Sequence, residues 1–234
     1  MIADFFWSYG GDTKIHWISW DRICRRKDIG GLGLRRLKEF NLALLAKQAW
    51  RVVVTPDSMV HKVFGQKYFP SSSFFDAGRS STPSFTWRSL LATRDILAAG
   101  LRWKVGDGRD IPIWGQPWLP RPGTFQLVAR PAALSTHTRV ADLISDTREW
   151  ISHLIKAEFH PLDADCILGI ALPDTATRDA LVWHYEKHGK LSVRSAYEVA
   201  RTLKMEAGGL ENRNRCYTSG TQRPNQRFYY LHGR

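Results

Sequence analysis

The sequence predicts a mainly α-helical protein with a small β component. We expect helices in the N-terminal half, one or two β-hairpins after them, and a disordered C-terminal tail. Apolar residues recur at helical spacing as far as Gly100, alternate with polar residues after it, and lose all periodicity beyond Met205. The 234 residues are 43% hydrophobic and include ten tryptophans, a composition typical of a folded chain.

The helical half is predicted from its apolar spacing and its breakers. Residues 14–27 (KIHWISWDRICRRK) place apolar side chains at helical intervals, and a glycine-rich turn, residues 30–33, ends the pattern. A second helix follows from Leu34 to Val54, with its apolar side chains on one face. The sequence Thr55-Pro56-Asp57 predicts a stop and the start of a third helix, in which proline takes the first helical position. Ser84 is expected to cap the next helix, whose apolar face begins with Trp87.

Two β-hairpins are predicted after Gly100. The alternating segments LRWKV and RDIPIW flank Gly106-Asp107-Gly108, which reads as a tight turn, and Pro112 limits the second strand to a sheet edge. ALVWHY (180–185) and KLSV (190–193) predict two further strands, joined by the turn 186–189. Helices are expected at 147–159 and 195–203, and residues 115–138 form a proline-rich connection.

We predict four segments along the chain. Residues 14–100 form a helical segment, 101–138 a hairpin with its proline-rich connection, and 139–205 a small α+β segment. Residues 206–234 form a disordered basic tail.

The charge distribution predicts a polyanionic partner. The net charge is +12, and residues 1–110 carry 18 Lys and Arg against 10 Asp and Glu, whereas residues 111–207 carry 11 of each. A basic front half is typical of proteins that bind nucleic acid. The alternative is a generally basic protein whose charges lie on solvated faces. No lipid-facing amphipathic segment with one clean apolar stripe stands out, so no membrane partner is expected.

Six basic residues flank the glycine-rich turn and form the candidate binding site. If the two flanking helices fold back on each other, these charges come together and can contact phosphates, with strong salt dependence and little sequence preference. The alternative is that they are the solvated faces of two amphipathic helices. The six are Arg25, Arg26, Lys27, Arg35, Arg36 and Lys38.

Other constellations are interpreted as structural. The glycine turn lacks the Gly-Lys-Ser/Thr ending of a nucleotide-binding loop. The tryptophans at 87, 103, 114 and 118 could stack bases, but core packing is favoured, with Trp103 and Trp114 facing each other across a hairpin. His184 with His188, and His153 with His160, lack the spacing of a metal site. Asp107 and Asp110 are interpreted as turn formers. We predict no catalytic residue, no metal ligand and no cofactor.

The cysteines and the lengths of the apolar runs indicate in which cellular compartment the protein is expected. Cys24, Cys166 and Cys216 are far apart and odd in number, which favours a reducing environment over a disulfide framework. No apolar run reaches the length of a transmembrane helix, and the N-terminus resembles neither a secretory signal nor a transit peptide. The location is otherwise undetermined.

Several long phrases resemble a known family. WDRICRRKDIGGLGLRRLKEFNLALLAKQAWR, KYFPSSSF, PSFTWRSLLATRDILAAGLRWKVGDGRDIPIWGQPWLP and WHYEKHGKLSVRSAYEVAR follow one another as in plant non-LTR (LINE-type) retrotransposon polyproteins. The chain resembles the segment downstream of the polymerase, running into the start of the reverse-transcriptase zinc-binding domain at 139–205. It also resembles stand-alone open reading frames of plant mitochondria, and the resemblance implies a nuclear or mitochondrial location.

Departures from that family bear on activity. The polymerase of the family needs two adjacent aspartates for its metal ions, and no Asp-Asp pair occurs in this chain. The paired cysteines of the zinc module and a ribonuclease H segment are also missing. We therefore expect a non-catalytic fragment that binds RNA or DNA backbone. The alternatives are a docking piece for a polymerase domain and a metal-dependent nuclease that uses Asp107, Asp110 or the His184/His188 pair.

Overall fold

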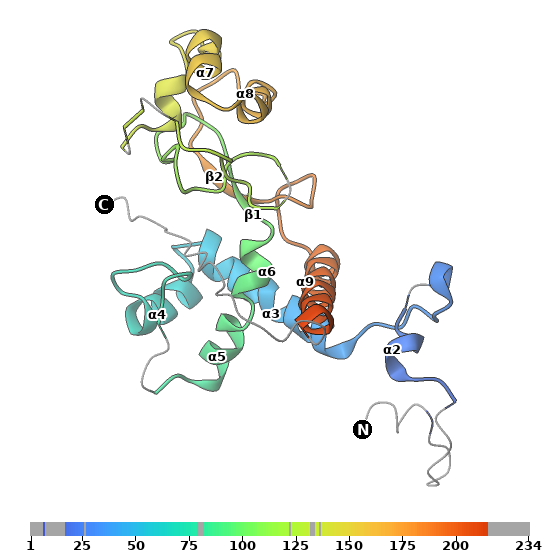
Figure 1. Ribbon diagram of the computed structural model, residues 1–234. Helices are drawn as coiled ribbons and strands as arrows, with labels where there is room; N and C mark the ends of the chain where they lie inside the picture. Colours follow the sequence, from blue (N-terminus) through green and yellow to red (C-terminus); the bar gives the residue numbers. More distant parts are fainter. Residues whose placement is uncertain are drawn as a thin grey trace. The chain divides into compact units, whose positions relative to one another are not determined.

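The computed structural model describes residues 7, 17–25, 27–78, 82–121, 123–131, 134–135 and 137–214, with side chains as far as residue 205 (Figure 1). The chain divides into two compact units, residues 1–41 and 42–234. Each unit is described by itself. No helix in the described ranges is both long enough and apolar enough to cross a membrane.

The described residues of the first unit contain little regular structure. It holds α2 (Trp20–Ile23), a 3-10 helix (Lys27–Ile29) and the first turn of α3 (Leu37–Val54). The helix predicted over 14–27 is therefore wrong in length, and residues 14–16 and 26 lie outside the described residues. Trp17 is 76% exposed, and Ile18 is also exposed. Helices of this length are stabilised mainly by burying an apolar face, and these two side chains bury little.

In the second unit α3 is followed by three shorter helices. These are α4 (Met59–Tyr68), α5 (Phe85–Leu91) and α6 (Arg94–Ala98). The predicted cap of α5 is confirmed, because Ser84 Oγ accepts a hydrogen bond from the Trp87 amide at 3.2 Å. The predicted start of α4, at Pro56, is wrong by three residues, because the helix begins at Met59. Ser58 caps it by accepting from the His61 amide, so Pro56 precedes the helix.

The first hydrophobic core packs α3 to α6 against the last helix, α9 (Val193–Asn214). Figure 1 shows α6 beside α9, in agreement with the contacts between them. Tyr68 stacks on Trp87 with ring centroids 4.5 Å apart, and Trp50 meets the edge of Trp183 at 6.0 Å. Large aromatic side chains bury much apolar area, so these rings supply a large part of the core.

The sheet joins two distant segments. Strands β1 (Leu101–Lys104) and β2 (Ala180–Trp183) pair antiparallel, with Leu101 opposite Trp183. Neither predicted hairpin forms. The loop after β1 directs the amides of Gly106, Gly108 and Asp110 to the carboxylate of Asp179, at 2.7 to 3.0 Å, instead of to a local partner strand. Residues 190–192 are irregular and lead into α9.

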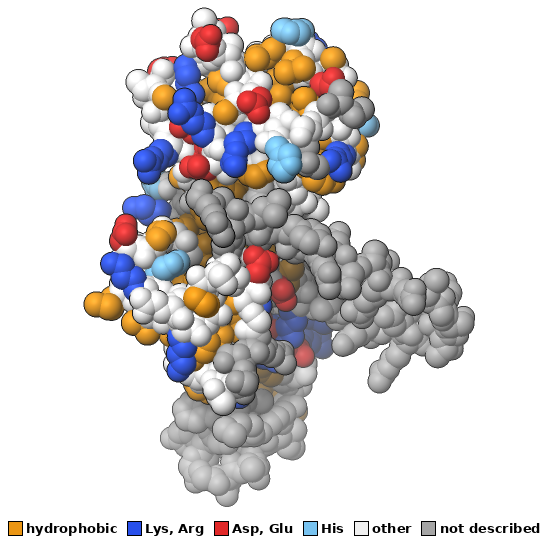
Figure 2. Space-filling model, turned by 90° about the vertical axis from the view of Figure 1, so that its left-hand side faces the viewer, with side chains coloured by type: hydrophobic (Ala, Val, Ile, Leu, Met, Phe, Trp, Pro, Cys, Tyr) orange, Lys and Arg blue, Asp and Glu red, His pale blue; other side chains and the backbone are white. Residues whose placement is uncertain are grey.

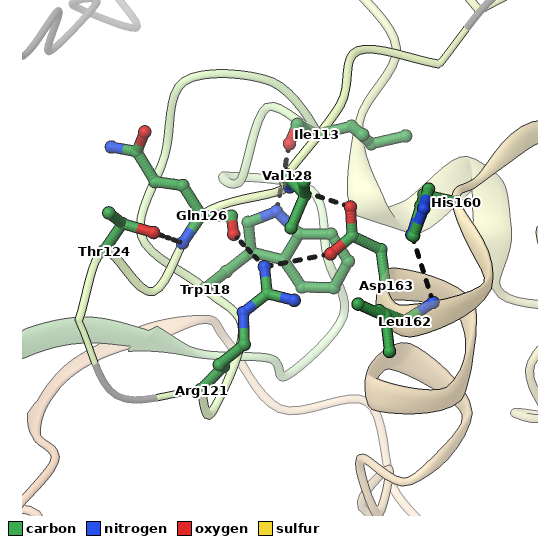
Figure 3. Close-up of polar contacts among 9 residues, drawn as sticks. All are labelled: Ile113, Trp118, Arg121, Thr124, Gln126, Val128, His160, Leu162 and Asp163. Atoms are coloured by element: carbon green, nitrogen blue, oxygen red, sulfur yellow. Dashed lines mark hydrogen bonds and ion pairs between the residues drawn. The ribbon is translucent and has the colours of Figure 1, made fainter.

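A second core lies between residues 105 and 167. It includes a 3-10 helix (Val140–Leu143), α7 (Ser152–Glu158) and α8 (Pro161–Leu168), of which α7 and α8 lie side by side in Figure 1. The helix predicted at 147–159 is thus shorter than expected, and α8 was not predicted. Asp163 of α8 is fully buried. It accepts from the Val128 amide at 2.8 Å and pairs with Arg121 at 2.9 Å (Figure 3).

The class predicted from the sequence, mainly helical with a small β component, is confirmed. Helix α9 continues to Asn214, beyond the predicted end at Leu203. The rest of the predicted tail, residues 215–234, lies outside the described residues. The four predicted segment boundaries stay a prediction.

Candidate nucleic-acid interface

The glycine-rich turn folds the chain back on itself in the first unit. The Leu32 amide donates to Ile23 O at 2.9 Å, and the Gly33 amide donates to Arg25 O at 2.8 Å. A Cβ at Gly31 would lie 2.1 Å from Arg25 O, so only glycine fits there. Gly30 and Gly33 have φ of +78° and +69°. The turn therefore brings residues 31–33 against residues 23–25.

The predicted basic residues around this turn differ in solvent exposure and in their contacts. Arg25, Lys27, Arg35 and Lys38 are exposed. The Arg35 guanidinium lies 4.8 Å from the centre of the Phe40 ring, a cation–π contact that orients it. Arg26 lies outside the described residues.

Arg36 has a structural role as well as a charge. It forms an ion pair with Asp21 at 3.2 Å, and its side chain is 25% exposed. Burial raises the pKa of the Cys24 thiol, while Arg36 opposes that rise and Asp21 and Glu39 add to it. These charges are therefore close enough to Cys24 to act on it. We expect Arg36 to hold the turn together and to contribute less to ligand contact than its exposed neighbours.

Basic side chains gather around the start of α3. A helix N-terminus carries a partial positive charge, and acidic residues normally stabilise it. Here the carboxylate in the first turn, Glu39, is buried, while Arg35, Arg36 and Lys38 stand at or just before the helix start. This placement gains nothing for helix stability. It adds positive charge at the helix N-terminus.

The second unit shows a mixed surface by comparison. On the face drawn in Figure 2, Lys and Arg side chains of the described residues stand among Asp and Glu side chains. Charges of alternating sign largely cancel beyond one Debye length. On this face the charges of both signs are therefore mixed.

The interpretation of the tryptophans as core residues is confirmed for two of them. Trp87 and Trp118 are fully buried. Trp103 is half-buried and donates from Nε1 to Gln116 Oε1 at 3.3 Å. The expected pairing of Trp103 with Trp114 is wrong, because β1 pairs with β2 and places Trp103 opposite Leu181.

The remaining candidates have structural partners. Asp107 is a turn former, as predicted, and its Oδ1 accepts from the Arg109 amide at 3.2 Å. His160 caps α8 by accepting from the Leu162 amide at 3.3 Å (Figure 3). His184 accepts from Arg102 Nε at 3.2 Å. Within the described part of the chain, no group of three or more His, Cys, Asp or Glu side chains is placed to hold a metal ion.

Comparison with known proteins reveals two relatives in Arabidopsis thaliana. An uncharacterized mitochondrial protein is 38% identical over 120 residues, which cover 50% of this chain and 78% of that protein. A protein named "Putative ribonuclease H protein" is 31% identical over 213 residues, which cover 85% of this chain but 33% of that protein. No protein-family model and no solved structure matches the chain.

These relatives define the class: the chain is similar to plant proteins, in agreement with the predicted resemblance to retrotransposon-related open reading frames. In particular, it belongs to the same family as the uncharacterized mitochondrial protein. It spans a third of the length of the second relative, so the nuclease in that name describes a much longer protein.

Proposed function

We propose that this chain is a non-catalytic segment of a plant non-LTR retrotransposon reverse-transcriptase polyprotein that binds RNA or DNA through its phosphate backbone. Residues 139–205 then correspond to the start of the zinc-binding domain of that polyprotein. The plant relatives support the family part of the proposal. The missing Asp-Asp pair supports the non-catalytic part.

One observation carries the binding part. The chain closes a glycine turn so that exposed Arg25 and Lys27 lie near the segment leading to Arg35 and Lys38, at the positive end of α3. Phosphate contacts made by such residues position a nucleic acid without reading its bases. We expect similar affinity for different sequences, and a binding constant that falls steeply with salt because condensed counterions are released.

The test measures binding of the full chain to labelled RNA and duplex DNA between about 50 and 200 mM salt. The test variant replaces Arg25, Lys27, Arg35 and Lys38 by alanine. The slope of log K against log salt should decrease by about 0.9 for each duplex phosphate contact that is lost.

A matched control variant loses the same charge from exposed positions outside the turn. It replaces Lys47, Arg51, Lys62 and Arg88, two lysines and two arginines that are exposed in the second unit. Equal loss of affinity in both variants would show that net charge alone matters and would reject the interface. The same labelled strands, incubated with Mg²⁺ or Mn²⁺, should stay uncut, and metal-dependent cleavage would support the nuclease alternative.

A second candidate, docking to a polymerase domain, is favoured by exposed apolar side chains. In the first unit Trp17, Ile29 and Leu32 are more than half exposed, and in the second unit Met59 and Phe85 are three-quarters exposed or more. Apolar side chains left in contact with water commonly mark a protein interface. A monomeric chain that melts cooperatively and stays in solution at high concentration would speak against this candidate.

A further inference from the structure

The second unit contains a basic pocket that is separate from the glycine turn. Its volume is about 510 Å³, within the range of small-ligand sites. β1 supplies Arg102 and Lys104, and the turn after β2 supplies His184, Lys187 and His188. The pocket therefore carries three permanent cations and two imidazoles.

The strand pairing explains how these residues converge. Arg102 and Lys104 are two positions apart on β1, so both side chains leave the same face of the strand. The His184 amide donates to Gly100 O at 2.8 Å and continues the β1–β2 ladder by one residue. This fixes the turn bearing Lys187 beside the same strand.

Arg102 is a partly buried cation with no carboxylate partner in the described part of the chain. Its Nε donates to His184 Nδ1 at 3.2 Å, and its Nη1 donates to Trp103 O at 3.1 Å. Burial lowers the pKa of the Arg102 guanidinium, and Cys166 opposes this shift to a lesser degree. Charges withdrawn from water are normally paired with an opposite charge or bound to a ligand. The remaining guanidinium nitrogen can meet an anion.

His184 is held as a neutral donor. Because Arg102 Nε can only donate, His184 Nδ1 must accept, and the ring proton lies on Nε2. Burial, and to a lesser degree the charge of Arg102, lower the pKa of the His184 imidazole. At neutral pH the ring therefore presents one N–H group and no charge.

The acidic residue of the pocket wall is already engaged. Glu186 accepts a hydrogen bond from Ser192 Oγ, and this bond is the largest cause of the lowered pKa of its carboxyl group. The carboxylate stays ionised and tied to the start of α9. It offsets one of the three positive charges and leaves an excess for a ligand.

We propose that this pocket binds a phosphate monoester, carried either by a small metabolite or by the terminus of a nucleic acid. Arg102 contacts the phosphate oxygens from the pocket floor, His184 Nε2 donates to them, and Lys104 and Lys187 neutralise the second charge at the mouth. Planar guanidinium groups bind phosphates and carboxylates through paired hydrogen bonds. The excess of cations favours the doubly charged phosphate over a carboxylate. This site does not depend on the interface proposed above.

In the experiment, the full chain is titrated with adenosine 5′-monophosphate, and separately with adenosine, at about 50 mM salt. Isothermal titration calorimetry measures the binding. Binding of the monophosphate and none of adenosine is the expected result. Arg102→Gln should weaken binding at least about tenfold, since it removes the charge-assisted hydrogen bonds. No binding of the monophosphate to the unaltered chain would overturn the proposal.

Matched variants separate the site from general charge. The double variant Lys104→Ala/Lys187→Ala alters only exposed side chains of the rim, so it tests the site even if Arg102→Gln fails to fold. It should weaken binding, whereas Lys47→Ala/Lys62→Ala, with the same loss of charge, should not. Equal affinity in the two double variants would overturn the proposal.

The source of the phosphate is decided by two oligonucleotides of one sequence. If a 5′-phosphorylated strand binds more tightly than its 5′-hydroxyl counterpart, and the rim variant loses that difference, the ligand is a nucleic-acid terminus. If the two strands bind equally while the monophosphate still binds, the ligand is a free small phosphate. Both results support the site, and failure of both ligands refutes it.

Discussion

At the scale of single residues, two glycines with the same backbone geometry have different reasons to be glycine. Gly108 and Gly115 have φ of +74° and +79°, a region that side chains with a Cβ rarely adopt. A Cβ at Gly108 would lie 2.4 Å from the Ala141 amide nitrogen, whereas at Gly115 nothing lies within 4 Å. Only the first position therefore combines backbone strain with a steric clash.

We predict that Gly108→Ala lowers the free energy of unfolding by about 3 kcal/mol or more, because strain and overpacking add. Gly115→Ala should cost about 1 to 2 kcal/mol, the strain alone. Urea unfolding of both variants, followed by circular dichroism, checks this. Equal costs would mean that the loop around Gly108 relaxes freely.

Ser192 combines a helix cap with an effect on acid stability. Its Oγ accepts from the Ser195 amide at 3.1 Å and donates to the Glu186 carboxylate. Because the folded-state pKa of Glu186 is lowered, its contribution to stability is present above the ordinary glutamate pKa of about 4.3. The contribution is lost as the pH falls through the folded-state pKa.

Ser192→Ala should therefore cost about 1 kcal/mol at pH 7 for the lost cap, in addition to the carboxylate effect. The stability gap between the variant and the natural chain should narrow as the solution is acidified below the ordinary glutamate pKa. Thermal melts across pH and an NMR titration of Glu186 measure this. An unchanged Glu186 titration in the variant would contradict the role given to Ser192.

Local signals in the sequence were reliable where a residue bonds to near neighbours. Ser84 as a cap and Asp107 as a turn former were predictable because their partners lie two or three residues away. Asp179 was not, because its amide partners are about 70 residues away in the chain. The exposed state of Arg25 and the ion pair of Arg36 likewise depend on folding that spacing alone does not specify.

At the scale of elements, the predicted hairpins failed for a physical reason. The chain that follows β1 contains Pro112, and Asp179 holds the backbone amides of the loop between them. β1 pairs with β2 instead, and this pairing brings Leu101 and Trp183, 82 residues apart in the chain, into the first core. The spacing of apolar residues predicted β1 and β2 but not their pairing, and it also predicted strands at 109–114 and 190–193 that do not form in the described residues.

Helix α8 is tied to the segment around residue 121 through the ion pair of Asp163 with Arg121. The Asp163 side chain is fully buried, whereas the Arg121 side chain is 29% exposed. Removing Arg121 and removing Asp163 should therefore have different effects on stability. We predict that Arg121→Ala destabilises the protein more than Asp163→Asn, because the first leaves a charged carboxylate buried while the second leaves an arginine that can reach water. The larger effect should be about 3 kcal/mol.

The check is a double-mutant cycle by urea unfolding. The variant Arg121→Ala/Asp163→Asn should be more stable than the sum of the two single losses predicts, since no uncompensated charge remains. Additive losses would show that the two side chains do not interact energetically in the folded chain.

At the scale of the whole molecule, the second unit buries two hydrophobic cores. Residues of the first core come from 43–101 and 183–200, and residues of the second from 105–167. The second core is therefore built from one continuous stretch, whose ends β1 and β2 bring together. Such a stretch can open without disrupting helices that do not contribute to it.

Ile155 is fully buried in the second core. We predict that Ile155→Ala lowers the free energy of unfolding of that core by about 2 to 5 kcal/mol. Native-state hydrogen exchange should then show faster exchange in α7 and α8, while α3 and α5 keep their protection. Leu97→Ala in the first core, also fully buried, is the reciprocal control and should expose α3, α5 and α9 first. If either substitution accelerates exchange equally in all helices, the strand pair couples the two cores into one cooperative unit. Residues 42–205 would then fold only as a whole. The pocket beside β1 would form only when both cores are folded.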